Sequence, residues 1–271
     1  DGAACMLTIA SAIGGAPATC MMRVVTESLE AHLRKLEKEG VVVRTGDDWI
    51  LKQVRSCEAD GYLVRNYDHL AFFAHDRRIG DYSLNIANRL SADYFRNRFG
   101  LERVTASYDL NCAQLDALLR TAPPEWFEVT IHQHMPMFHM EHCVFCALLS
   151  PGTNHTNCGR PCDHHQVRLR DRLGLEHLLQ ADVGCRNTLY NAVAQSGAEV
   201  VPELLAAGVR HFRVELLEEN ADQVRETIGL YRDLLAGRLS GKEVWRQLKA
   251  VNRVGVTRGT LEERRNPLAI L

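Results

Sequence analysis

Cysteine and histidine gather in one part of this 271-residue chain. Five of the nine cysteines lie between Cys143 and Cys185, and eight of the twelve histidines lie between His132 and His177. Clustered thiolates repel one another unless a cation neutralises them, so a bound metal is the simplest explanation of such a group. The fold must therefore bring several turns of one segment to a common point.

The segment holds two close pairs and a later single cysteine: Cys143 and Cys146, Cys158 and Cys162, and Cys185. A two-residue spacer closes a tight loop that turns both thiolates toward one metal ion. Structural zinc would use the two pairs, with His139 or His142 as an alternative to one thiolate. An iron–sulfur cluster would use Cys143, Cys146, Cys158 and either Cys162 or Cys185. The spacing alone leaves both metals open.

Composition is that of a globular protein, with 46% hydrophobic and 24% charged residues and a formal charge of −2. The balanced charge implies no global attraction to nucleic acid or to anionic membranes. An odd number of cysteines does not suggest a secreted disulfide framework, so we expect reduced thiols. No apolar run approaches the roughly 18 residues of a membrane span. We therefore expect a cytoplasmic or organellar protein without a membrane partner.

Short β-branched runs alternate with helical stretches, as is typical of βα units. Strands are predicted over 61–65, 81–86, 103–107, 127–131 and 211–216. Helices are predicted over 67–74, 91–99, 111–120 and 200–207, and one long helix or a pair over 220–249. The sequence thus predicts an α/β fold of the (β/α) TIM-like barrel type, complete or truncated, with a cysteine-rich metal-binding loop segment.

Three parts are expected along the chain. Residues 1–57 would be the N-terminal part of the barrel or a truncated end, 58–236 the barrel with a cysteine-rich insert at 139–187, and 237–271 a C-terminal helix and tail. The sequence begins with Asp1 rather than Met, so we expect other domains of a longer chain among the partners.

Several motifs follow one another in a characteristic order. They are Leu63-Val64-Arg65-Asn66, Asp81-Tyr82-Ser83-Leu84-Asn85, a strand ending in His132, Cys146-Ala147-Leu148-Leu149-Ser150, Asn157-Cys158-Gly159-Arg160-Pro161-Cys162, and Gly208-Val209 leading into Phe212-Arg213-Val214-Glu215. Over roughly residues 58–236 this order resembles the U-thirty-two family, also called collagenase-like peptidases. The Cys–Leu–Ser and Cys-x₃-Cys parts are the most specific.

The resemblance implies a (β/α) barrel with a 4Fe–4S cluster on four cysteines. Several members of the family are implied to hydroxylate their substrates without oxygen, using prephenate or a related metabolite as oxygen donor. Their substrates include cytidine in ribosomal RNA, uridine in transfer RNA, and ubiquinone precursors. The resemblance therefore favours iron–sulfur over zinc, with RNA and a small-molecule co-substrate as partners.

Carried onto this chain, the resemblance implies metal ligands at Cys143, Cys146, Cys158 and Cys185. The family often has its first cysteine seven residues before the Cys–Leu–Ser cysteine, where this chain has His139. The family's usual Lys-Ile-Glu-Gly-Arg motif is also changed, because residues 213–217 of this chain read Arg-Val-Glu-Leu-Leu. These departures indicate a divergent branch, such as the second barrel of two-barrel members.

Strand-end residues line the mouth of such barrels. The resemblance therefore suggests His132, Glu215 and Arg65 as catalytic residues, and Asn66, Asn85 and Arg186 as substrate-binding residues. We expect an RNA-modifying hydroxylase. A collagenase-like peptidase and a non-catalytic, metal-stabilised module are the alternatives. The sequence has neither a His-Glu-x-x-His nor a Gly-x-Ser-x-Gly motif to favour the peptidase.

Overall fold

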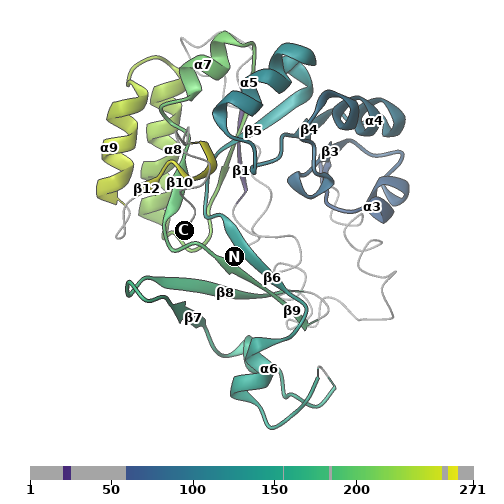
Figure 1. The fold of residues 1–271 in the computed structure, drawn as a ribbon, viewed down its shortest axis with the longest axis vertical. Coiled ribbons are helices and arrows are strands. Elements are labelled where there is room, and N and C mark those ends of the chain that lie inside the picture. The colour runs from purple at the N-terminus through teal and green to yellow at the C-terminus, as the bar shows by residue number, and fades with distance from the viewer. Residues whose placement is uncertain (1–20, 26–58, 155, 183–184, 252–255, 262–271) are drawn as a thin grey trace.

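A curved parallel sheet forms the larger part of the protein. The computed structural model describes residues 21–25, 59–154, 156–182, 185–251 and 256–261. Neighbouring strands in the sheet run in the order β1 (Met21–Val25), β11 (His211–Glu215), β5 (Phe127–Gln133), β4 (Arg103–Thr105), β3 (Arg78–Gly80) and β2 (Tyr62–Val64), with parallel pairing throughout this path. The chain is thus a mixed α/β protein with a partial TIM-like barrel (Figure 1).

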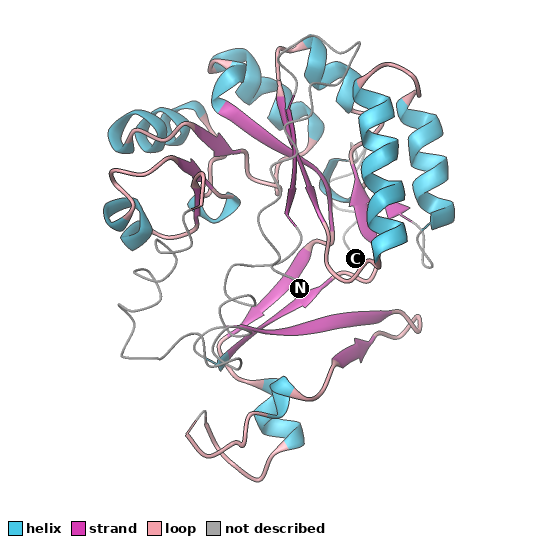
Figure 2. Ribbon diagram, turned by 180° about the vertical axis from the view of Figure 1, so that it is seen from behind, coloured by secondary structure: helices cyan, strands magenta, loops and turns pink. Residues whose placement is uncertain are grey.

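Helices surround these parallel strands (Figures 1 and 2). They are α3 (Tyr67–Phe72), α4 (Arg89–Phe99), α5 (Cys112–Thr121), α7 (Val201–Ala206), α8 (Ala221–Leu235) and α9 (Gly241–Val251). Strand residues such as Phe127 and Phe212 form one buried cluster with helix residues such as Leu115 and Leu234. Burying one apolar face of each element between the two layers stabilises this half barrel. Two short strands, β10 (Ala194–Ser196) and β12 (Val256–Thr257), extend the sheet beside β5.

A second, antiparallel sheet carries the cysteine-rich segment. Its order is β6 (Pro136–Met140), β9 (Arg186–Tyr190), β8 (Glu176–Asp182) and β7 (Val167–Arg170). Helix α6 (Val144–Leu149) packs on this sheet through Phe145, which contacts the cluster of Leu179 and Leu189. In Figure 1 the small sheet lies below the parallel strands, and α6 lies at its lower end.

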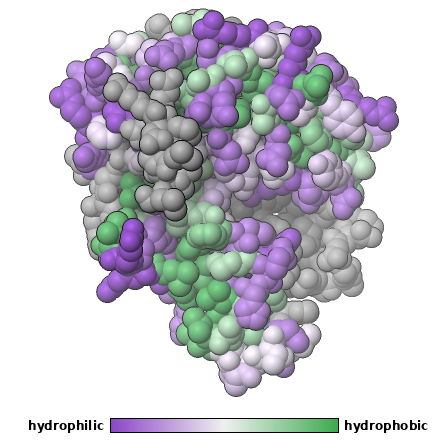
Figure 3. Space-filling view, in the orientation of Figure 1, coloured by the Kyte–Doolittle hydropathy of each residue, from purple (hydrophilic) through white to green (hydrophobic). Residues whose placement is uncertain are grey.

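The small sheet is only partly covered. Hydrophobic surface gathers over this lower part of the molecule in Figure 3. Phe138 of β6, Leu148 of α6 and Leu173 in the β7–β8 turn are all exposed large hydrophobic residues.

Most of the predicted elements of the barrel are confirmed. Strands at 61–65, 103–107, 127–131 and 211–216 correspond to β2, β4, β5 and β11. The region 220–249 is a pair of helices, because Gly237 adopts a positive φ of 70° between them. The expected N-terminal part lies outside the described residues apart from β1, as do residues 262–271 of the expected tail.

The strand predicted over 81–86 is wrong. Residues Tyr82–Leu84 form a 3-10 turn that places Leu84 in the core, and the strand is Arg78–Gly80 instead. A hydrophobicity pattern does not identify this strand, because it contains the charged Arg78. Arg78 can nevertheless be buried, since its guanidinium donates to the carbonyls of Leu70, Ala74 and Phe99. The cysteine-rich segment, expected as a loop, also contains α6 and the strands of the small sheet.

No helix in the described part of the chain is long and apolar enough to cross a membrane.

Three helices of the half barrel begin with the same cap. The side chains of Asn88, Asn111 and Asn220 each accept a hydrogen bond from the backbone N–H three residues later, and the side chain at that position accepts one from the Asn backbone N–H. This reciprocal pairing satisfies two of the N–H groups that a helix start leaves unpaired.

We predict that Asn220→Ala lowers the free energy of unfolding by about 1 kcal/mol, because α8 loses its cap. Urea denaturation would measure this. Glu226→Ala, on the exposed face of the same helix, is the matched control. Equal effects of the two substitutions would contradict the assigned cap.

Candidate functional site

Charged and aromatic residues meet where the parallel strands end. Arg65 follows β2, Asp81 follows β3, Tyr108 comes three residues after β4, and Glu215 ends β11. Because the carboxyl ends of parallel strands lie at one edge of a sheet, these residues form the mouth of the half barrel.

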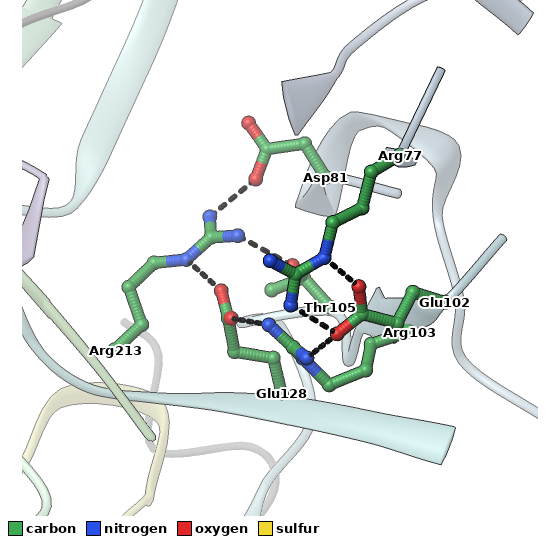
Figure 4. A network of polar contacts seen from close by, with 7 residues as sticks. All are labelled: Arg77, Asp81, Glu102, Arg103, Thr105, Glu128 and Arg213. Atoms are coloured by element: carbon green, nitrogen blue, oxygen red, sulfur yellow. Dashed lines mark hydrogen bonds and ion pairs between the residues drawn. The ribbon is translucent and has the colours of Figure 1, made fainter. Parts of the chain in front are cut away.

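Arg213 lies at the centre of this edge with its side chain fully buried (Figure 4). Its Nε donates to Glu128 Oε1 at 2.6 Å and its Nη2 to Thr105 Oγ1 at 2.7 Å. Its Nη1 donates to Asp81 Oδ1 and, at 3.1 Å, to Glu215 Oε1. One guanidinium thus joins β4, β5, β11 and the loop after β3.

The network continues toward the protein surface. Arg103 Nη2 lies 3.6 Å from Glu128 Oε2, and Arg103 Nη1 donates to Glu102. Glu102 also accepts from Arg77, whose Nη2 lies 3.0 Å from Glu102 Oε1 (Figure 4). Alternating positive and negative groups therefore compensate the buried charges near β4 and β5.

The pKa values of Asp81 and Glu215 are shifted in opposite directions. Burial alone would raise the pKa of Asp81, but Arg213 and Arg65 lower it to about 2; Arg65 Nε donates to Asp81 Oδ2 at 2.6 Å. Burial, together with the charge of Asp81, raises the pKa of Glu215. Two carboxyl groups whose pKa values are pushed apart can play different roles, one as a fixed anion and one as a proton carrier.

The mouth also reaches the small sheet. Burial would lower the pKa of Arg65, but Asp81 raises it, and Tyr82, Glu215 and Tyr190 add to the rise. Tyr190 is the last residue of β9, so this strand ends beside the mouth.

His132 points away from the mouth. The pairing of β5 with β11 shifts between Thr130 and His132, which makes Ile131 an extra residue on β5. Such a bulge turns the following side chain to the other face of the sheet. The His132 ring lies against Tyr231 of α8, with ring centroids 5.6 Å apart, and is 1% exposed. Its predicted catalytic role remains a prediction.

The hydrogen bonds of His132 define its tautomer. The Tyr231 hydroxyl donates to the Ile131 carbonyl at 2.9 Å, and His132 Nδ1 lies 3.3 Å from Tyr231 Oη. The phenol oxygen must therefore accept from His132 Nδ1–H, which leaves Nε2 with a lone pair and no partner among the described residues. Burial lowers the pKa of His132 to about 4, so the ring is neutral near pH 7.

The three predicted substrate-binding residues lie in three different local structures. Asn66 caps α3 by accepting from His69 N–H at 3.0 Å. Asn85 is exposed and adopts a positive φ of 54° at the end of the 3-10 turn. Arg186 begins β9, at the opposite end of that strand from Tyr190. Their substrate-binding roles remain predictions.

The first cysteine pair is built into α6. Cys143 caps this helix, since its Sγ accepts from Cys146 N–H at 3.4 Å. Asn187 of β9 supports the cap by accepting from Val144 N–H at 2.6 Å. Cys146 is buried, with its Sγ 3.5 Å from the Gly152 carbonyl.

A short loop brings Cys158 back to α6. Ser150 Oγ donates to the Cys158 carbonyl at 2.7 Å, which explains why a serine follows Cys146 at this spacing. Gly152 lies so close to the returning chain that an added Cβ would meet the Asn157 carbonyl oxygen at 2.4 Å. The loop therefore closes only with glycine at that position.

Three other thiols act on Cys146. Burial raises the pKa of the Cys146 thiol, and Cys158, Cys143 and Cys185 raise it further. These are the four cysteines predicted as metal ligands. Cys162, like Cys143, packs against the apolar cluster of the small sheet. Among the described residues, no three Cys, His, Asp or Glu side chains already stand in a metal-binding arrangement.

The thiols and the mouth lie at the two ends of β9. Cys185 directly precedes this strand and Tyr190 ends it. Five extended residues span roughly 17 Å. The candidate site therefore has two parts, a thiol group and a charged mouth, and the small sheet connects them.

Sequence reasoning found the thiols but missed the mouth's central residues. Arg213 and Asp81 occur in the motifs of the sequence without a predicted role, and no pattern in the sequence predicts a role for Glu128 or Tyr108. The signal available in the sequence was the presence of charged residues inside strands that otherwise read as buried.

Two protein-family models match parts of the chain. The model of Peptidase family U32 matches residues 50–266. The model of the beta-lactamase associated winged helix domain matches residues 26–49, which lie outside the described residues. Neither the curated proteins nor the solved structures contain a significant match.

We predict that Arg213→Met lowers the free energy of unfolding by about 3–5 kcal/mol, because Asp81 and Glu128 stay buried without this guanidinium. Urea denaturation would measure the loss. Arg225→Met removes an exposed arginine of α8 and should cost under about 0.5 kcal/mol. An Arg213→Met protein as stable as this control would contradict the proposed importance of the network.

His132 should make stability depend on pH. Its pKa of about 4 in the folded state lies below the ordinary value of 6.5, so below pH 6.5 the unfolded state takes up a proton that the folded state refuses. Stability is therefore fully present above pH 6.5 and falls by up to roughly 3 kcal/mol as the pH approaches 4.

His132→Asn keeps a donor to Tyr231 but removes this titration. Unfolding free energies of both proteins measured between pH 7 and pH 4.5 should converge toward low pH. Parallel curves would show that His132 does not titrate as described.

Proposed function

Because the chain belongs to peptidase family U32, we propose that it is an iron–sulfur protein that hydroxylates a base of ribosomal or transfer RNA, or a related planar substrate, without molecular oxygen. The observation that carries this proposal is the gathering of thiols around α6. Cys143 Sγ accepts from Cys146 N–H at 3.4 Å, Ser150 ties Cys158 back to the helix, and Cys158, Cys143 and Cys185 each raise the pKa of the Cys146 thiol. Like-charged thiolates in one place indicate a need for a cation.

The donor set fits an iron–sulfur cluster. Four soft sulfur ligands would come from Cys143, Cys146, Cys158 and Cys185. A cluster bound there would supply electrons. Zinc is the alternative for the same thiols, with Cys162 as a further donor.

The mouth of the half barrel is suited to hold a substrate. Arg65 offers a positive charge at the edge of the sheet, and the Asp81 carboxylate fixes its orientation. Glu215, whose pKa is raised, can hold or release a proton next to a bound substrate. The oxygen atom would come from a small-molecule co-substrate such as prephenate.

Metal analysis tests the thiol part. Protein purified without oxygen should contain about four iron atoms and four sulfides per chain and absorb broadly near ~400 nm. Ser substitution of Cys143, Cys146, Cys158 or Cys185 should abolish this content. Cys162→Ser should retain the iron and sulfide. Cys112→Ser should retain them too, because Cys112 lies on α5, away from the other thiols (Figure 1). Zinc in place of iron would refute the iron–sulfur assignment.

RNA analysis tests the reaction. Nucleosides from cells lacking the protein should lose one species that is a single oxygen heavier than its parent, and the wild-type gene should restore it. Glu215→Gln should keep its iron but fail to restore the nucleoside. Cleavage of a collagen-like peptide that persists after metal removal, with RNA unchanged, would support the peptidase alternative instead.

A further inference from the structure

Two tyrosines meet at the mouth beside Arg65. Tyr82 follows β3 and Tyr108 follows β4, and their ring centroids are 4.7 Å apart with a tilt of 52° between the planes. Both rings are only partly buried. Partly exposed aromatic pairs at the ends of barrel strands offer flat apolar surface to a ligand.

Arg65 extends this surface with a directed positive charge. Its Cζ lies 5.5 Å from the centre of the Tyr82 ring, and its Nε is bound by Asp81 at 2.6 Å. The side chain is 38% exposed, and among the described residues its Nη1 and Nη2 have no hydrogen-bond partner. Asp81 thus fixes one edge of the guanidinium and leaves its other donors for an incoming anion.

The backbone on both sides is anchored. Ser83 Oγ donates to the Arg65 carbonyl at 2.5 Å, which ties the loop after β2 to the loop after β3. Thr260 Oγ1 donates to the Tyr108 carbonyl at 2.6 Å, which ties the loop after β4 to the C-terminal turn. A site held this way binds without a large ordering cost.

From these contacts we infer that Tyr82, Tyr108 and Arg65 form a binding site for a planar ring that carries an anionic oxygen group. The ring stacks on one tyrosine and meets the other at an angle, because their planes are tilted by 52°, and the anionic group binds the free end of the Arg65 guanidinium. Rings with such groups occur in nucleotides, where the anion is a phosphate, and in small cyclic carboxylates. The inference deepens the proposed function and rests on it for the identity of the mouth as the substrate end.

Calorimetric titration of the full chain with cytidine 5′-monophosphate, benzoate, cytidine and inorganic phosphate tests the site. We expect one of the first two probes to bind, and the ring or the anion alone to bind about tenfold more weakly or not at all. Binding of the nucleotide identifies the phosphate source, and binding of benzoate identifies the carboxylate source. Failure of both, or equal binding of cytidine alone, would overturn the inference.

Substitutions locate the binding. Tyr82→Leu and Tyr108→Leu should weaken it about tenfold, because base stacking on an aromatic ring is lost. Arg65→Met should weaken binding of the anionic ring probe more than binding of uncharged cytidine. Tyr82→Phe keeps the ring and should bind like wild type. Tyr94→Leu removes an exposed tyrosine of α4 and is the matched control.

Thermal unfolding of each variant separates loss of the site from loss of the fold. If Tyr82→Leu does not fold, Tyr108→Leu and Arg65→Met decide the matter. Unchanged binding in folded variants would contradict the inference. Iron content should be the same in all of them, so a failed ring site leaves the cluster untouched, and an absent cluster leaves the binding result valid.

Discussion

The buried guanidinium of Arg213 holds the inner side of the half barrel together. Four hydrogen bonds from its N–H groups reach Glu128, Thr105, Asp81 and Glu215, which come from separate strands or their following loops. A charge taken fully out of water is tolerated only when such partners surround it. The same contacts set the state of the mouth, because Arg213 keeps Asp81 ionised while Glu215, more weakly held, has a raised pKa.

The strand that carries Arg213 also positions the small sheet. The loop after β11 contains Glu219, whose Oε1 lies 3.1 Å from His134 Nε2, and Glu218, which pairs with Arg168 of β7. Burial would raise the pKa of Glu219, but the hydrogen bond with His134 lowers it to about 2. Burial would lower the pKa of His134, but the same bond raises it, so both shifts favour the charged pair. One strand and its loop therefore fix both the charges of the mouth and the sheet that leads to the thiols.

The sequence predicted those features that depend on neighbouring residues. The strands at 103–107 and 211–216 were found because their apolar runs are local, and the thiols because cysteine spacing is local. The ion pairs of Arg213 join residues 85 and 132 positions apart, and no short-range pattern contains them. The bulge at Ile131, which turns His132 toward α8, likewise follows from the register between two distant strands.

The arginine at position 213 has a physical reason in this network. A lysine at position 213 would offer three donors on a compact ammonium group, whereas arginine offers five in a fixed plane. The partners of Arg213 lie around that plane, with Glu128 at Nε, Thr105 at Nη2, and Asp81 and Glu215 at Nη1. Arginine at this position thus binds three carboxylates, whereas a single ion pair would bind one. The same contacts hold Glu215 beside Arg213 at the charged mouth.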